Sequence, residues 1–215
     1  MQLLRCSACG KYQREAYLYN ARAPGTDWSI VAHTVEGCGI RSIGRLLAIS
    51  PTTVMARIRR LAHGLSPGPI ARGRHYEVDE LATYVRNKKR RVWVTCALDR
   101  QSRAVVALRV GSRGKRALRP LVETLLLADA RSIRTDGHEV YGALIPNALH
   151  KVKQRGINRI ERLNLALRTC LKRLARKTIC FSRSLEMLRA CATLFCWGSR
   201  DGPHAKSAAV RSGMV

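Results

Sequence analysis

A proline- and glycine-rich segment, Leu65-Ser66-Pro67-Gly68-Pro69, divides the chain into two parts with different hydrophobic patterns. Proline lacks a backbone donor and glycine favours turns, so we expect neither a helix nor a strand to continue through this segment. The part before it has helical periodicity, whereas strand-like and helical stretches alternate after it. The domains expected from this division are a short polar N-terminus over 1–25, a helical domain over 26–63, a linker over 64–74, a mixed domain over 75–197 and a disordered tail over 198–215.

The helical part carries the pattern of a helix-turn-helix. Ser50 stands as an N-cap before Pro51, a combination that favours the start of a helix. Val54 and Ile58 then fall on one face of that helix, which would enter a DNA major groove with its N-terminal side chains leading. The alternative is three packed helices whose arginines are solvated. The outward side chains that we predict to contact DNA are Thr52, Thr53, Arg57 and Arg60.

The charge of the chain favours a polyanionic partner. Its 215 residues include 40 Lys+Arg and 14 Asp+Glu, a formal net charge of +26. Nucleic acid is the leading candidate because each phosphate contact releases counterions and gains affinity. RNA is a weaker alternative, since aromatic residues that could stack on bases make up only 5% of the chain.

Other classes of protein are not expected. No apolar run approaches the roughly 18 residues of a membrane span, so we expect no membrane partner. The N-terminus has no apolar signal region, and the eight scattered cysteines suit a reducing cytosol.

The part after the linker predicts a mixed sheet with helices on its faces. Strand patterns and helical periodicity alternate along it. The expected order is β-β-β-α-β-α-α, with strands over 76–84, 91–98, 104–110 and 132–135, helices over 115–127 and 158–174, and one further helix at the end.

Three carboxylates in this basic chain are candidates for a metal site. Asp79 lies in the first expected strand, Asp136 follows the fourth, and Glu161 lies on the long helix. If the two strands are neighbours, the aspartates meet, and the helix can bring the glutamate to them. Oxygen ligands of this kind suit two Mg²⁺ or Mn²⁺ ions, which together can activate a water or a 3′-hydroxyl for attack on a phosphodiester.

The long helix supports such a catalytic face. Steps of seven and eleven residues from Glu161 return to nearly the same angle, which places Arg168 and Lys172 beside it for the DNA backbone. The alternative is a surface helix whose charges have no such role.

Several motifs resemble insertion sequence 1 type transposases. The similar stretches are Tyr76-Glu-Val-Asp79-Glu-Leu-Ala-Thr-Tyr84, Thr135-Asp136-Gly137, Asn158-Arg-Ile-Glu161-Arg-Leu-Asn-Leu-Ala-Leu-Arg168 and the basic run from Arg173 to Ser184. The similarity covers roughly residues 5–187 and keeps the motifs in order. It implies an RNase H-like catalytic domain with a DDE triad formed by Asp79, Asp136 and Glu161.

The same resemblance implies a function and partners. The protein would bind double-stranded DNA at the ends of its own mobile element, cut it and join it to target DNA. It would act as a homo-oligomer in the prokaryotic cytoplasm, at the nucleoid. A non-catalytic DNA-binding remnant, or a regulator of the element, is the alternative function.

The N-terminus departs from the family. The family has a zinc ribbon with two Cys-x-x-Cys pairs, and this chain has only Cys6 and Cys9. Tetrahedral Zn²⁺ normally takes four ligands, so these two cysteines form at most part of a zinc site.

Overall fold

The computed structural model describes residues 3–14, 19–152, 158–175 and 177–198. A two-stranded hairpin at the N-terminus precedes three helices, a five-stranded sheet and the helices that cover the sheet. The elements, in chain order, are β1 (Leu3–Arg5), β2 (Tyr12–Arg14), η1 (Asn20–Arg22), α1 (Thr26–Val35), α2 (Ile40–Leu46), α3 (Pro51–His63), β3 (His75–Tyr84), β4 (Arg91–Asp99), β5 (Val105–Gly111), α4 (Lys115–Leu127), β6 (Ser132–Thr135), α5 (Glu139–Gly142), β7 (His150–Val152), α6 (Asn158–Cys170), η2 (Lys172–Leu174) and α7 (Leu185–Trp197).

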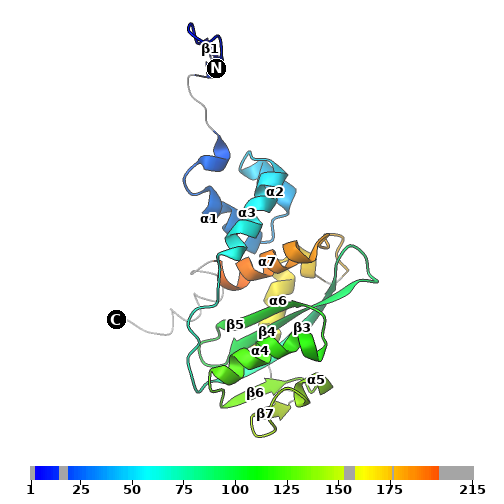
Figure 1. The fold of residues 1–215 in the computed structure, drawn as a ribbon. Coiled ribbons are helices and arrows are strands. Elements are labelled where there is room, and N and C mark those ends of the chain that lie inside the picture. Colours follow the sequence, from blue (N-terminus) through cyan, green and yellow to red (C-terminus); the bar gives the residue numbers. More distant parts are fainter. Residues whose placement is uncertain (1–2, 15–18, 153–157, 176, 199–215) are drawn as a thin grey trace, which may run out of the picture.

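The five-stranded sheet has the order β5-β4-β3-β6-β7 (Figure 1). Strands β3, β4 and β5 form an antiparallel meander, and the shorter β6 and β7 run parallel to β3. This order and these directions are those of an RNase H-like sheet. The predicted mixed sheet with flanking helices is therefore confirmed.

The two faces of the sheet are covered by different helices. Side chains alternate along a strand, so Tyr76 and Val78 of β3 pack in one apolar cluster with α4, whereas Leu81 packs in another with α6 and α7. Strand β4 is buried along most of its length, as expected of a strand covered on both faces.

The three N-terminal helices follow the predicted pattern. Ser50 caps α3 by accepting a hydrogen bond from the Thr53 amide at 3.0 Å, and Pro51 is the first helical residue. Val54 and Ile58 are fully buried on the inner face of α3. The start of α3 and its inner face are thus fixed by a local cap and an apolar stripe, and the helix-turn-helix stays a prediction.

These helices also pack on the rest of the molecule. α1 and α3 contact α7 (Figure 1). Their buried residues belong to the same apolar cluster as those of α6 and α7. Gly37, between α1 and α2, has a φ of +83° and lies directly against the Cys170 carbonyl at the end of α6, where a Cβ would clash. The division between 26–63 and 75–197 stays a prediction.

The predicted helix over 158–174 is too long. α6 ends at Cys170, Leu171 is extended, and Lys172 lies in η2. The Cys170 carbonyl lies against Gly37 and does not accept the Leu174 amide, which bonds the Leu171 carbonyl instead. The short 3₁₀ turn that follows keeps Leu171 and Leu174 buried. Lys172 therefore does not share the α6 stripe of Glu161 and Arg168.

The four-residue α5 and the three-residue β7 were not predicted, since elements this short have no periodicity to detect. No helix within the described ranges is long and apolar enough to cross a bilayer. Most of the predicted tail, 199–215, lies outside the described residues.

Candidate active site

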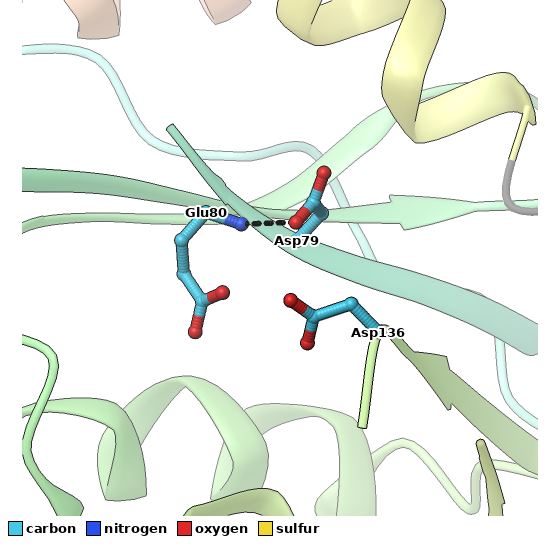
Figure 2. A group of neighbouring side chains, drawn as sticks. All are labelled: Asp79, Glu80 and Asp136. Atoms are coloured by element: carbon cyan, nitrogen blue, oxygen red, sulfur yellow. Dashed lines mark hydrogen bonds between the residues drawn. The ribbon is translucent and has the colours of Figure 1, made fainter. Parts of the chain in front are cut away.

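The site forms where β6 ends beside β3. The parallel pairing of these strands stops at Glu77 opposite Arg134, and β6 ends one residue later. Gly137, at φ +91°, then turns the chain away. A Cβ at this position would lie only 2.9 Å from a side-chain carbon of Val152, which favours glycine there. The edge of β3 is left open at Asp79, and Asp136 lies next to it (Figure 2).

A third carboxylate joins the two aspartates. One oxygen from each of Asp79, Glu80 and Asp136 lies within 4.8 Å of the others (Figure 2). Successive side chains of a strand point to opposite faces, so Asp79 and Glu80 reach Asp136 from either side of the open edge. Glu80 was not predicted as a site residue, because the sequence offers no signal for it except its position beside Asp79.

Glu80 is held by two residues from other parts of the chain, one on α5 and one in the loop between β5 and α4. Its buried carboxylate accepts a hydrogen bond from the Tyr141 hydroxyl at 2.7 Å and lies 3.4 Å from the Arg113 guanidinium. Burial, followed by the charge of Glu80, raises the pKa of Tyr141 far above its usual range, so its hydroxyl stays a donor.

Arg113 links the carboxylates electrostatically. Its Nη2 also lies 3.6 Å from Asp136 Oδ2, and its guanidinium stacks 4.5 Å from the centre of the Trp93 ring. The cation therefore offsets part of the repulsion between Glu80 and Asp136.

Helix α6 covers Asp79 from the other face of the sheet. Asn164 Nδ2 donates to Asp79 Oδ2 at 2.8 Å, and its buried Oδ1 has no hydrogen-bond partner among the described residues. Glu161 is exposed one turn before Asn164, outside the group of three carboxylates. Arg168, one turn after Asn164, donates to the Leu174 carbonyl.

The environment of Asp79 disfavours its ionised form. Burial is the main cause that raises its pKa to about 6, and the charges of Asp136 and Glu80 add to it. The Glu80 amide and the Asn164 side chain oppose this shift by donating hydrogen bonds to the carboxylate.

The donor set fits a hard divalent cation. Three converging carboxylates repel one another unless a cation neutralises them, and the unpartnered amide oxygen of Asn164 lies beside Asp79. Oxygen-only sites of this kind suit Mg²⁺ or Mn²⁺.

The raised pKa of Asp79 predicts a pH-dependent affinity for metal. A cation binds the ionised carboxylate, so protons compete with it as the pH falls through about 6. We expect the affinity for Mn²⁺, followed by electron paramagnetic resonance, to fall about tenfold per pH unit below that pKa. Equal affinity at about pH 5 and about pH 7.5 would contradict this expectation.

Without metal, the same shift acts on stability. The pKa of Asp79 is raised from its ordinary value of 3.8 to about 6, so the folded protein retains a proton that the unfolded chain releases in this interval. Asp79 therefore lowers the free energy of unfolding as the pH rises through this interval.

The side chains predicted to contact DNA lie on α3. Thr52 is exposed and Thr53 half-buried, and both hydroxyls lie within 2.9 Å of Ser50 Oγ. Arg57 and Arg60 each lie 2.6 Å from a carboxylate oxygen of Asp27 on α1, and Arg57 also donates to a backbone carbonyl of η1. Arg57 is only 19% exposed, whereas Arg60 is 62% exposed.

Cys6 and Cys9 lie together in the tight turn between β1 and β2. Both are exposed, and hydrogen bonds from Cys9 lower the pKa of the Cys6 thiol. In the part of the chain that the structure describes, no third metal-ligating side chain joins them. Zinc binding stays a prediction.

The sequence of this chain is similar to those of several known proteins. The sequence model of the family described as IS1 transposase matches residues 75–195. The insertion element iso-IS1n protein InsB of Shigella dysenteriae is 39% identical over 111 residues, 52% of this chain and 85% of that protein. The IS1 protein InsB of Shigella flexneri is 40% identical over 111 residues and 85% of its length, and the IS1 4 protein InsB of Escherichia coli K12 is 40% identical over 66% of its length.

A solved structure with a similar chain is the intasome of simian T-cell lymphotropic virus in complex with PP2A regulatory subunit B56 gamma. The match has a TM-score of 0.33 and 16% identity, and covers 66% of this chain and 59% of that one. A similarity this low supports no argument about function.

Proposed function

Because the chain belongs to the IS1 transposase family, we propose that it binds the ends of its own insertion element and catalyses metal-dependent cleavage and strand transfer of DNA. The observation that carries the proposal is the convergence of Asp79, Glu80 and Asp136 at the open edge of β3. In this proposal Asp79, Asp136 and Glu161 hold the divalent cations, with Mg²⁺ or Mn²⁺ as the candidates.

Each residue of the site has a proposed part. Two divalent cations held by these carboxylates would activate the nucleophile and would stabilise the leaving oxygen of an in-line displacement. Asn164 orients the Asp79 carboxylate through its hydrogen bond. Tyr141 and Arg113 hold Glu80 close to the aspartates. Glu161, exposed one turn before Asn164 on α6, is the proposed third metal ligand.

DNA binding is proposed to use two surfaces. Thr52 and Thr53 lie at the exposed start of α3, and Arg57 and Arg60 would exchange Asp27 for phosphates or base edges. Arg168 and Lys172 would hold the DNA backbone near the site. Paired element ends require more than one protomer, so we propose a homo-oligomer on double-stranded DNA, in the prokaryotic cytoplasm at the nucleoid.

The proposal is tested with a labelled duplex that carries the element's own end. Site-specific nicking is expected with Mg²⁺ or Mn²⁺, leaving a 3′-hydroxyl, and none with a chelator. A duplex with a scrambled end serves as the control. Tight binding of the end without nicking in either metal would instead identify a DNA-binding remnant or regulator of the element.

A further inference from the structure

Glu77 is a buried carboxylate two residues before Asp79 on the same face of β3. Its side chain is 1% exposed. Oε1 accepts a hydrogen bond from Arg100 Nε at 2.7 Å, and Oε2 accepts one from the Ile160 amide at 3.0 Å. A buried carboxylate is costly unless it is paired, and both oxygens of Glu77 are paired.

The second of these bonds joins β3 to the first turn of α6. α6 begins at Asn158, so the Ile160 amide is one of the N–H groups that a helix leaves without an internal partner. A carboxylate at this end is also favoured by the helix dipole. Glu77 therefore caps α6 from another element of the fold.

Arg100 extends the same connection to the turn between β4 and β5. Its amide donates to the His75 carbonyl of β3, and its own carbonyl accepts from Arg159 Nη1 of α6 at 2.6 Å. The turn, the strand and the start of the helix are thus tied together around the Glu77 carboxylate.

The spacing of the contacts sets the register of α6. Glu77 bonds Ile160, and two residues further along β3, Asp79 bonds Asn164, four residues further along α6. Two strand residues span about 6.6 Å and four helical residues rise about 6.0 Å, so both bonds form together. A slip of one residue would shift the helix by about 1.5 Å and turn it by about 100°.

We propose that Glu77 is a positioning residue, which fixes α6 over β3 so that Asn164 stands at Asp79. The inference rests on the proposed function only for its effect on cleavage. Its effect on α6 itself is independent of any activity.

Glu77→Gln tests the proposal in the full-length protein. The amide oxygen can still accept from Ile160, but the amide nitrogen faces the Arg100 donor, so the connection is broken with almost no change of shape. We expect hydrogen exchange in α6 to rise about tenfold or more, with exchange in β3 and β4 unchanged. The single-turnover rate of cleavage should fall about 10- to 100-fold at saturating DNA and metal, while DNA affinity stays within about twofold.

Two further variants keep the test decisive. Leu125→Ala removes a buried side chain of α4 on the opposite face of the sheet, so it lowers stability without touching α6. Arg100→Gln removes the ionic partner of Glu77 and keeps the Glu77–Ile160 bond. Hydrogen exchange in α6 should therefore rise by a smaller factor than in Glu77→Gln. If Glu77→Gln does not fold, the α6 exchange of Arg100→Gln tests the positioning role in its place.

The outcomes separate the two proposals. Unchanged α6 exchange in Glu77→Gln, or a change no larger than in Leu125→Ala, would overturn the positioning role. Faster α6 exchange in Glu77→Gln would support that role even if the unmodified protein fails to cleave DNA, a failure that would count against the proposed function alone.

Discussion

Asp79→Asn is expected to lower the rate of strand cleavage by about 10³-fold or more, with the affinity for the element end changed by less than about twofold. Asp79 is the carboxylate on which the site converges, since Asp136 and Glu80 approach it and Asn164 bonds it. Asparagine keeps an oxygen that can accept from Asn164 but carries no charge for a divalent cation. The measurement is single-turnover cleavage of the labelled element end, with binding followed separately by fluorescence anisotropy.

A matched control for this change is Asp129→Asn. Asp129 is exposed and pairs at 3.7 Å with Arg72, which is 81% exposed, so the same loss of charge occurs outside the site. Its cleavage should equal that of the unmodified protein. Loss of both binding and cleavage in Asp79→Asn, or cleavage within about tenfold of normal, would contradict the proposed role.

Glu161→Gln is expected to lower cleavage about as much as Asp79→Asn, whereas Glu80→Gln should have a smaller effect. Glu161 makes no hydrogen bond or ion pair to any described residue, so its carboxylate is available to a metal ion. The two oxygens of Glu80 already face the Tyr141 hydroxyl and Arg113, and glutamine can still accept from the tyrosine. The two single-turnover rates, measured in Mg²⁺ and Mn²⁺, compare the two glutamates directly.

The reverse order of effects would reassign the third carboxylate. If Glu80→Gln abolishes cleavage and Glu161→Gln does not, Glu80 completes the metal site, and α6 contributes through Asn164 alone. Binding of the element end should be the same in both variants, because neither side chain belongs to the surface proposed for end recognition.

Local patterns in the sequence predicted most elements of the fold. Helix α4 spans Lys115–Leu127 and strand β6 spans Ser132–Thr135, as expected from their periodicity. The cap at Ser50 and the following proline likewise located the start of α3. Such signals act between residues within one turn or one strand, so they are legible without the rest of the molecule.

The site was only partly predictable for a geometric reason. The sequence predicted that Asp79 and Asp136 meet if their strands are neighbours, and β3 does pair with β6. Glu80 was missed because adjacent residues of a strand point to opposite faces, and both reach Asp136 only where β6 stops and the edge opens. The end of α6 was also not predicted, because it depends on a contact between Cys170 and Gly37, which are far apart in the chain.

The order of motifs, the charge of +26 and the local helix and strand signals were sufficient to indicate an IS1-type transposase with an RNase H-like sheet. Tertiary structure decided which polar side chains lie together. Glu77 caps a helix that begins about eighty residues later in the chain. Tyr141 bonds Glu80 across sixty-one residues, and Arg57 bonds Asp27 across thirty. Caps and periodicity depend on neighbours in the chain. Hydrogen bonds and ion pairs between distant segments depend on which of these segments lie side by side, and only the folded arrangement of strands and helices determines that.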